Sequence, residues 1–436
     1  MWSKNVSFQG GELHISGISA RTIARDFGTP VYVIDKEDFI SRARSFKEVL
    51  AQSFGESSGE VYYASKAFIC TEVGRWIKEI GIGIDVATGG ELAVALAAGI
   101  SPEKIQVHGN NKSLSEIDRA VSVGVGSIVI DSLQEIERVA QAARSHHTVQ
   151  KVFIRVTPGI HAHTHDSIAT AHEDVKFGLS IANGAAWDAI LKIKEEENLK
   201  LVGIHAHIGS QIFGTESFRM SAERLIGLLA RYRDEFFEEL GELDLGGGFG
   251  IAYLPGDTYL HASEVIPAMK RSVQDYCAAK GLKVPRVSIE PGRAIVGPSM
   301  FTLYTVGTTK DVSLEDGSKR RYISIDGGMS DNMRPALYDA EYFALLANRE
   351  SHAVPASSRI VGKHCETGDI LIRSIDLPSD VQPGDLIAMP ATGAYGYSMA
   401  NNYNRVPRPP VVAIENGNAR IIVRRETEED LLSLDL

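Results

Sequence analysis

The sequence reads VYYAS at residues 61–65, and three similar runs follow: GIDVA (83–87), IQVHG (105–109) and SIVIDS (127–132). Each run is short and rich in apolar residues, as expected of a strand buried in a parallel sheet. Between them lie segments with apolar residues at three- and four-residue spacing, such as GELAVALAAG (90–99), and this spacing predicts helices. The alternation predicts parallel strands joined by crossover helices.

The same alternation continues to residue 292. Four further runs bring the expected strands to eight: KVFIRV (151–156), LVGIHAHIG (201–209), ELDLGGG (242–248) and RVSIEPG (286–292). Eight strand–helix units match a (β/α)₈ barrel, which typically takes about 250 residues. We therefore expect an α/β protein with such a barrel over residues 40–300.

The rest of the chain has a different texture. Strand-like runs such as RRYISID (320–326), DILIRSID (369–376) and RIIVRRE (420–426) are separated by Gly, Pro and Asp, and long helical patterns are few. GELHISGIS (11–19) also reads as hairpin material. These patterns predict a second, mostly antiparallel β domain built from both chain ends, over residues 1–39 and 301–436.

Composition and charge exclude several classes of protein. Of the 436 residues, 44% are hydrophobic, 23% charged and 7% aromatic, which is close to the globular average and excludes general disorder. The 45 basic and 56 acidic residues give a net charge of −11, so no nucleic acid partner is expected.

Cysteine usage and hydropathy bear on the compartment. Cys70, Cys277 and Cys365 are too few and too scattered for a disulfide framework, which favours a reducing, cytoplasmic compartment. No leader is recognisable in the first residues, and no apolar run approaches the roughly 20 residues that cross a bilayer. We therefore expect a soluble protein without a membrane partner.

Reactive residues gather at the expected strand ends, which is where barrel enzymes carry their catalytic groups. The first strand ends in Ser65-Lys66 and the third in His108-Gly109-Asn110. The later strand ends carry His207-Ile208-Gly209-Ser210, Gly246-Gly247-Gly248 and Glu290-Pro291-Gly292-Arg293. All of these side chains are therefore expected on one face of the barrel.

Each of these features alone also has an ordinary structural explanation. Lys66 can form an imine with an aldehyde, but a strand-end lysine is more often solvated. The triple glycine can bind phosphate or simply form a tight turn. Glu290 can keep a pyridine nitrogen protonated or pair with Arg293, and His207 can stack on a flat cofactor or pack in the core. Together, however, a lysine, a phosphate turn, an acid and an imidazole describe a pyridoxal phosphate site.

Longer motifs agree with this interpretation. YASKA (63–67), HAHIGS (205–210), the triple glycine and EPGR (290–293) resemble those of the fold-type III pyridoxal-phosphate decarboxylases, and the likeness covers nearly the whole chain. Within that group, RPALY (334–338), HCETGD (364–369) and GAY (393–395) resemble the diaminopimelate decarboxylases. This resemblance implies decarboxylation of meso-diaminopimelate to L-lysine, the last step of lysine biosynthesis.

The resemblance also implies a role for each matching residue. Lys66 would carry pyridoxal 5'-phosphate covalently, His207 would stack on its ring, and Glu290 would face its ring nitrogen. The other residues that would bind the cofactor are Ser210, Gly247, Gly248, Gly292, Arg293 and Tyr395. The residues that would bind the substrate are Arg293, Arg334, Tyr338, Glu366 and Tyr395.

Cys365 is the expected catalytic proton donor to the α-carbon, with Lys66 as the alternative. Without its neighbours, Cys365 would be read as a small hydrophobe. In this family Cys365 and Glu366 belong to a loop that enters the active site of the partner subunit. The resemblance therefore implies a homodimer with shared active sites.

Several alternatives stay open at this point. A metal-dependent barrel hydrolase would use a pair such as His205 and His207, but on the first strand rather than the sixth. An alanine racemase would place Arg rather than Glu290 against the ring nitrogen. A non-catalytic binding homologue should have lost Lys66, Glu290 or Cys365.

Decarboxylases of ornithine, arginine or carboxynorspermidine are nearer alternatives, because they share the cofactor site. They differ at the distal end of the substrate, where a second charged head needs Arg334, Tyr338 and Glu366. Separately, histidines cluster at His161, His163, His165 and His172. Such a cluster can bind a metal, but between two strands it is more often a loop, so no metal is expected.

Overall fold

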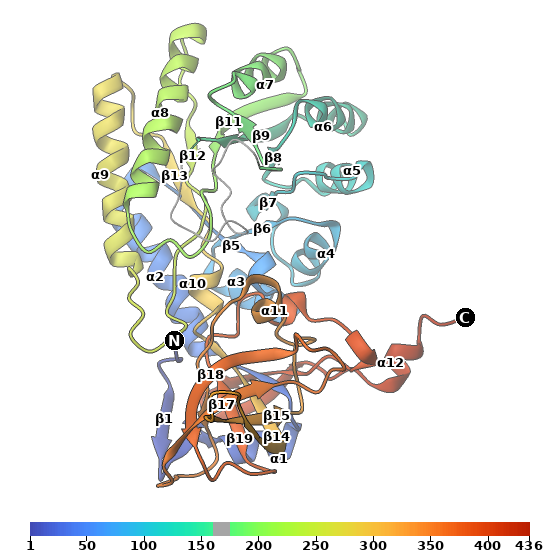
Figure 1. Ribbon diagram of the computed structural model, residues 1–436. Coiled ribbons are helices and arrows are strands. Elements are labelled where there is room, and N and C mark those ends of the chain that lie inside the picture. The colour runs from blue at the N-terminus through green and yellow to red at the C-terminus, as the bar shows by residue number, and fades with distance from the viewer. Residues whose placement is uncertain (160–174) are drawn as a thin grey trace. The chain divides into compact units, whose positions relative to one another are not determined.

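The computed structural model describes residues 1–159 and 175–436 (Figure 1). This part of the chain forms two compact units. The β unit comprises residues 1–41, 251–258 and 295–436, and the barrel unit comprises residues 42–250 and 259–294. Segment 251–258 thus groups with the β unit although it lies inside the range expected for the barrel. The predicted histidine cluster, His161 to His172, lies outside the described residues.

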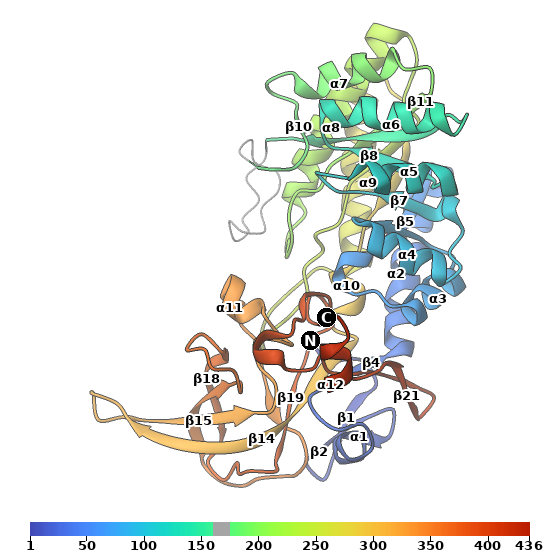
Figure 2. The same ribbon diagram turned by 90° about the vertical axis from the view of Figure 1, so that its right-hand side faces the viewer.

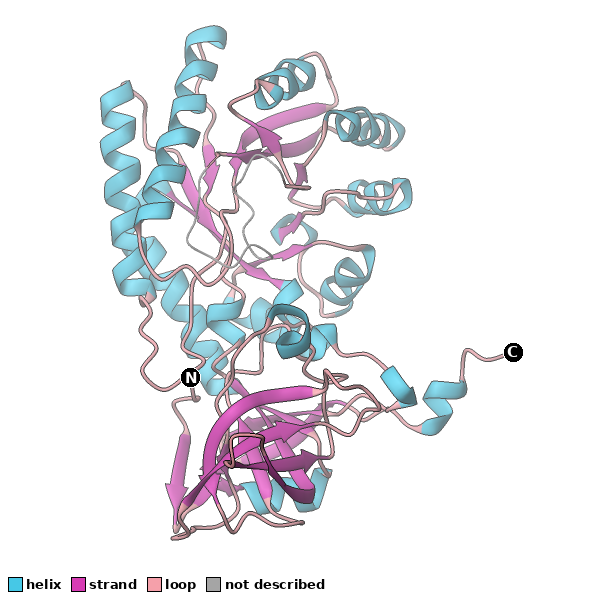
Figure 3. Ribbon diagram, in the orientation of Figure 1, coloured by secondary structure: helices cyan, strands magenta, loops and turns pink. Residues whose placement is uncertain are grey.

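Eight parallel strands form the barrel, each hydrogen-bonded to the next around the ring (Figure 3). The ring closes where β8 pairs with β9 and β13 pairs with β5. The strands are β5 (Ser58–Ala64), β6 (Gly83–Val86), β7 (Ile105–Val107), β8 (Ser127–Ile130), β9 (Gln150–Thr157), β11 (Leu199–His205), β12 (Glu242–Asp244) and β13 (Arg286–Ile289). A two-residue strand, β10 (Leu179–Ser180), adds to β9. The predicted α/β barrel is confirmed.

Helices follow the strands and cover the barrel from outside (Figure 3). They are α2 (Lys36–Phe54), α3 (Thr71–Ile80), α4 (Gly89–Ala97), α5 (Leu114–Val123), α6 (Leu133–Ser145), α7 (Ala185–Lys194), α8 (Glu216–Phe236) and α9 (Ala262–Lys280). The short helix α10 (Arg293–Val296) follows β13. The local sequence sets their ends: in α5 a capping box joins Ser113 and Glu116, and Gly124 ends the helix at φ +76°. No helix in the described ranges is long and apolar enough to cross a membrane.

Polar side chains occur among the buried residues of the barrel strands. Asp85, Gln106, Arg155, His205 and Asp244 lie on five different strands and are all buried. Buried polar groups are costly unless they are hydrogen-bonded or paired, so such a concentration in one barrel points to a functional interior.

The β unit contains a small antiparallel sheet and a larger mixed sheet. The small sheet consists of β1 (Val6–Gln9), β2 (Glu12–Ile15) and β3 (Ile18–Ser19), followed by helix α1 (Ala20–Phe27). The larger sheet contains β4 (Val31–Asp35), β14 (Met300–Ser313), β15 (Lys319–Ile325), β16 (Leu345–Leu346), β17 (Pro355–Val361), β18 (Ile370–Pro378), β19 (Leu386–Met389), β20 (Val411–Glu415) and β21 (Asn418–Val423). Two short helices, α11 (Arg334–Tyr338) and α12 (Glu428–Leu432), complete the unit.

Strand β4 joins the two ends of the chain in this larger sheet. It pairs antiparallel with β14, where Val33 lies opposite Phe301, and parallel with β20. Strands β14 and β15 continue as a long antiparallel ribbon (Figure 2). Most pairs of the sheet are antiparallel, and Val33 and Phe301 share a hydrophobic core with Leu13 and Val412. The prediction of a mostly antiparallel β domain that takes strands from both chain ends is confirmed.

A buried ion pair, Lys112 with Glu135, joins two segments of the barrel unit. The Nζ of Lys112 lies 2.8 Å from Oε1 of Glu135 on α6, and it also donates to the carbonyl oxygens of Gly109 and Val129. Burial lowers the pKa of Lys112, whereas Glu135 raises it. Glu135→Ala would leave a buried ammonium without its carboxylate, so we expect a loss of about 3–5 kcal/mol in the free energy of unfolding.

Glu137 on the same helix is the matched control. It pairs with Arg144 at 2.7 Å, but both side chains are about half exposed. Glu137→Ala should therefore cost less than about 1 kcal/mol. Differential scanning calorimetry of the two variants measures the difference in stability. Equal melting temperatures would contradict the expected contribution of the Lys112–Glu135 pair to the free energy of unfolding.

Candidate active site

The carboxyl ends of the barrel strands carry the residues that the sequence singled out. Lys66 lies in the 3₁₀ turn Ser65–Ala67 directly after β5, and its side chain is exposed. His207 follows β11 and Glu290 follows β13. Burial raises the pKa of Asp85 and the charge of Lys66 opposes that rise, whereas burial and then Lys66 both lower the pKa of His207. Lys66 thus acts on both groups, which indicates that the three surround one region of the barrel mouth.

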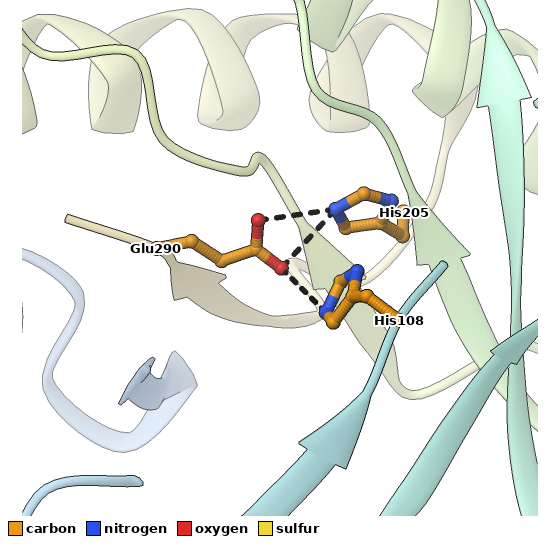
Figure 4. A group of neighbouring side chains, drawn as sticks. All are labelled: His108, His205 and Glu290. Carbon is orange, nitrogen blue, oxygen red and sulfur yellow. Dashed lines mark hydrogen bonds and ion pairs between the residues drawn. The ribbon is translucent and has the colours of Figure 1, made fainter. Parts of the chain in front are cut away.

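Glu290 has two imidazole partners that the sequence did not assign to it (Figure 4). Its Oε1 lies 3.0 Å from Nε2 of His108 and 3.2 Å from Nε2 of His205. The sequence marked His108 as a strand-end residue without a role and considered His205 only in a metal pair with His207. Alternate residues of a strand point to the same face, and His108 and His205 both follow this rule. Only closure of the barrel, however, brings their two strands to Glu290.

All three side chains are buried, and their charges depend on each other. Burial raises the pKa of Glu290, but the nearby His108 and His205 outweigh burial and hold that pKa well below its usual range. Burial lowers the pKa of His108 to about 4, although Glu290 opposes this shift. The carboxylate is therefore ionised and the His108 imidazole neutral near pH 7.

Two further carboxyl groups contribute to this interior. Burial raises the pKa of Asp85 and of Asp244 well above the usual range, and the negative charge of Glu290 raises both further. Since neighbouring carboxylates in a low-dielectric interior cannot all ionise, Glu290 is the acid that keeps its charge.

The glycine turn after β12 has no room for side chains. A Cβ on Gly247 would lie 2.2 Å from the carbonyl oxygen of Glu290, and one on Gly248 would lie 2.4 Å from that of Gly209. Gly248 also has φ +99°, which disfavours any other residue. The turn is thus built around closely approaching backbone, as sites that bind phosphate through N–H groups are.

Two polar side chains of the barrel unit accompany this turn. Arg293 Nη2 donates a hydrogen bond to Ser210 Oγ at 3.0 Å, and Arg293 is buried. Gly247 N–H donates to Nδ1 of His207 at 3.2 Å, so the neutral ring of His207 carries its proton on Nε2. Burial, with Lys66 next in effect, lowers the pKa of His207 well below its usual value. Gly292 also approaches its surroundings closely, because a Cβ there would lie 2.7 Å from that of Ala64.

The remaining predicted residues belong to the β unit. Arg334 is buried at the start of α11, its guanidinium lies 4.8 Å from the ring centre of Tyr253 and 5.5 Å from that of Tyr342, and it donates a hydrogen bond to the Tyr342 hydroxyl. The sequence did not predict these two tyrosines. Tyr338 at the end of α11 is half-buried. Tyr395 is also half-buried and has φ +60°.

Cys365 and Glu366 lie on an exposed loop of the β unit. The backbone N–H of Cys365 donates to Oδ1 of Asn404 at 3.0 Å. Asp369 anchors the loop, because its carboxylate accepts from the N–H of His364 at 2.8 Å and of Met329 at 2.7 Å. The loop is therefore held at its base and presents the thiol and carboxylate to its surroundings.

Comparison with known proteins bears on this arrangement. The family described as pyridoxal-dependent decarboxylase, pyridoxal binding domain, matches residues 36–297. Diaminopimelate decarboxylase of Mycobacterium tuberculosis is 51% identical over 441 residues, covering 100% of this chain and 98% of the relative. That of Bacillus subtilis is 45% identical, covering 98% and 96%. The chain belongs to the diaminopimelate decarboxylase family.

A solved structure of this family has the same fold. Diaminopimelate decarboxylase from M. jannaschii in complex with L-lysine matches with a TM-score of 0.92 at 30% identity, covering 100% of this chain and 99% of that chain. The family assignment confirms the resemblance seen in the sequence and makes the chain a decarboxylase that depends on pyridoxal phosphate.

The barrel unit fits this cofactor chemically. The closely packed glycine turn keeps side chains away from its backbone, and Arg293 with Ser210 offers a cation and a hydroxyl in the same unit. The buried, ionised Glu290 is the type of group that pairs with a pyridine nitrogen. Lys66 at the barrel mouth offers an amine, the group that forms an imine with an aldehyde.

The glycine turn yields a prediction about cofactor retention. Gly247→Ala would push the backbone of Glu290 away from a Cβ only 2.2 Å distant, and we expect at least about tenfold weaker binding of pyridoxal phosphate, a loss of about 1.4 kcal/mol. Fluorescence titration of the apoenzyme with pyridoxal phosphate measures the dissociation constant.

Gly227→Ala is the control, because Gly227 lies inside helix α8 and a Cβ there meets nothing within 4 Å. This variant should bind the cofactor as the unmodified enzyme does. Equal affinities for Gly247→Ala and Gly227→Ala would show that the close turn does not shape the binding site.

Proposed function

We propose that the protein converts meso-diaminopimelate to L-lysine and carbon dioxide, the last step of lysine biosynthesis. The observation that carries this proposal is similarity along the full chain, 51% to the M. tuberculosis enzyme. The bound L-lysine of the M. jannaschii structure is the product expected for this reaction. A lysine/ornithine decarboxylase from Vibrio vulnificus is 21% identical and therefore supports only the common fold.

Pyridoxal phosphate supplies an electron sink that stabilises the carbanion left when the α-carboxylate departs. We propose that Lys66 binds the cofactor covalently, that His207 stacks on its ring and that Glu290 faces its ring nitrogen. The phosphate would be held by Ser210, Gly247, Gly248 and Tyr395, and Gly292 and Arg293 would also bind the cofactor. The contact between Arg293 and Ser210 and the exclusion of side chains from the glycine turn support this part of the proposal.

Glu290 would hold a proton on the ring nitrogen through its negative charge. Cys365 would return a proton to the α-carbon, with Lys66 as the alternative donor. The thiol of Cys365 is exposed on its loop, which leaves it accessible to a substrate. His207, with its proton on Nε2 and its pKa lowered, would remain neutral and would not compete for that proton.

Substrate selectivity would come from charges in the β unit. Arg334 would bind the carboxylate that the reaction retains, together with Tyr338, Arg293 and Tyr395, and Glu366 would bind the neighbouring ammonium. Two tyrosine rings flank the buried Arg334 guanidinium and restrict its orientation, which suits a residue that recognises one carboxylate geometry.

We also propose that the enzyme is a homodimer in which Cys365 and Glu366 act in the active site of the partner subunit. Their exposure on an anchored loop supports this assignment. A cytoplasmic location is proposed as well, since three scattered cysteines are too few for the disulfide framework typical of secreted proteins.

Substrate choice tests the proposed reaction. Release of carbon dioxide should be fastest from meso-diaminopimelate, and L-ornithine and L-arginine should react far more slowly because they lack a distal carboxylate. Arg334→Ala should lower kcat/KM for diaminopimelate by about 10- to 150-fold, the value of one charge-assisted hydrogen bond of about 1.5–3 kcal/mol.

Arg359→Ala is the control for that variant, because its guanidinium also lies over a tyrosine, 5.6 Å from the ring centre of Tyr322, but has no proposed role. It should keep the unmodified kcat/KM. Faster turnover of ornithine than of diaminopimelate by the unmodified enzyme would refute the proposed function.

Mixed dimers test the shared active site. Lys66→Ala and Cys365→Ala homodimers should each be nearly inactive. When equal amounts of both are unfolded and reassembled at random, about half the dimers combine one chain of each, and each such dimer holds one intact site if sites are shared. About a quarter of the original sites should then recover, measured as carbon dioxide release.

Unmodified enzyme taken through the same unfolding gives the reference activity, and native mass spectrometry shows the fraction of mixed dimers. If mixed dimers form and activity stays at the level of the parent variants, both residues act within one chain and the shared site is disproved.

A further inference from the structure

Two imidazoles face the carboxylate of Glu290 through their Nε2 atoms. Nε2 of His108 lies 3.0 Å from Oε1 of Glu290 (Figure 4). The same nitrogen hydrogen-bonds to Oε1 of Gln106 at 3.1 Å. An atom with oxygen acceptors on two sides must carry a hydrogen, so the proton of the neutral His108 ring is on Nε2. The N–H of His108 is therefore shared between the Gln106 amide oxygen, to which it hydrogen-bonds, and the nearby Glu290 anion, whose pKa it lowers.

His205 makes the same kind of contact from another strand. Its Nε2 lies 3.2 Å from Oε1 and 3.3 Å from Oε2 of Glu290. Its Nδ1 is buried and has no hydrogen-bond partner within the described part of the chain. An unpaired buried acceptor costs less than an unpaired charged donor, which favours the neutral ring with its hydrogen on Nε2.

This tautomer assignment has a consequence for charge. Two imidazolium rings beside the single negative charge of Glu290 would leave the group with a net positive charge. Two neutral N–H donors instead stabilise the anion and leave its negative charge in place. The rings also pack edge-on against each other at 4.9 Å between centres, so each limits the orientation of the other. Glu290 is thus fixed in position and in ionisation state.

The charge of Glu290 matters if it faces a pyridine nitrogen, as the proposed function holds. An acid and a pyridine compete for one proton. If the acid keeps the proton, the ring is neutral and accepts electrons poorly, and if the nitrogen keeps it, the ring is a strong electron sink. Whatever stabilises the anion of Glu290 therefore moves the proton to the nitrogen.

We propose that His108 and His205 are positioning residues that hold Glu290 as an anion through two neutral N–H donors, so that the proton shared with the ring nitrogen of bound pyridoxal phosphate stays on the nitrogen. This inference rests on the proposed role of Glu290. It assigns to the imidazoles a function in tuning the cofactor, although neither needs to touch it.

The other groups around Glu290 act in different directions. The titratable residues that interact with it electrostatically, besides the two imidazoles, are Tyr62, Asp85, Arg155, His207 and Asp244. Asp85 and Asp244 would disfavour its negative charge if they ionised, and Arg155 favours it. Because Arg155 also lies 3.9 Å from Asp131, its charge is shared, and His108 and His205 are the neighbours that lower the pKa of Glu290 most.

The same three residues also have the composition of a metal site. Their ligand atoms lie within 4.8 Å of one another. Two imidazoles and one carboxylate suit zinc as well as they suit a hydrogen-bonded anion. The experiment therefore includes a measurement of metal content.

The test reads the proton on the ring nitrogen directly. The unmodified enzyme, His108→Phe and His108→Gln are reconstituted with pyridoxal phosphate labelled with ¹⁵N in the ring, and the ¹⁵N chemical shift is followed against pH. Phe keeps the ring shape but has no donor, so the pH at which the nitrogen loses its proton should fall by about one to two units, the effect of one hydrogen bond to a charged group.

Gln provides the matched control, because its amide nitrogen reaches about as far as Nε2 and donates an N–H. His108→Gln should return the midpoint to within about half a unit of the unmodified enzyme. At His205, substitution by Phe should lower the pH midpoint of the ring nitrogen and substitution by Gln should restore it, as at His108. For the Phe variants, kcat should fall while KM for the substrate changes little, since the substrate's binding groups are untouched.

The outcomes separate the inference from the function on which it rests. Borohydride reduction of the unmodified enzyme should attach the cofactor to Lys66, and attachment elsewhere would overturn the proposed function and the inference with it. Attachment to Lys66 with the same ¹⁵N midpoint in a folded His108→Phe variant would overturn the inference alone. Stoichiometric zinc in the unmodified enzyme that is lost in His108→Gln would also overturn it. If His108→Phe does not fold, His108→Ala takes its place in the comparison.

Discussion

Pairing of β13 with β5 closes the barrel, and the functional groups of the barrel unit depend on that closure. Ile289 lies opposite Val61 in this pair, and the N–H of Ala64 donates to the carbonyl oxygen of Pro291 at 3.3 Å. The segment after the last strand, which carries Glu290, is thereby fixed beside the segment after the first, which carries Lys66. Some 220 residues of chain separate the two in sequence, and only a closed ring of strands makes them neighbours.

Closure of the barrel also brings several carboxyl groups together in a buried interior, next to two imidazoles. The barrel buries three carboxyl groups near one another, and in a low-dielectric interior most of them must stay protonated. The distribution of N–H donors decides which acid ionises: Glu290 has two imidazole donors, whereas burial dominates at Asp85 and Asp244. The interior thus contains one stabilised anion, that of Glu290, beside the two imidazoles.

In the β unit, local contacts fix the shape of one exposed loop and the position of one buried arginine. Asp369 binds backbone N–H groups of two segments, and Tyr253 and Tyr342 confine Arg334. Tyr253 comes from the short segment 251–258, which groups with the β unit although it is flanked by barrel sequence on both sides. Carboxylate-to-backbone bonds of this kind restrict loops without extra hydrophobic core, which suits surfaces that must remain accessible.

The sequence by itself determined the repeated strand–helix pattern, the β domain drawn from both chain ends and the residues at the strand ends, because each rests on local periodicity or on short motifs. Tertiary structure alone decided that His108 and His205 meet at Glu290, that Asp85 and Asp244 share its interior and that Tyr253 joins the β unit. These contacts connect strands that are distant in sequence, and pKa values follow from burial and from neighbours that no local pattern encodes. The sequence specifies which ionisable residues are present, but burial and the neighbours that the closed barrel brings to them set their charge states.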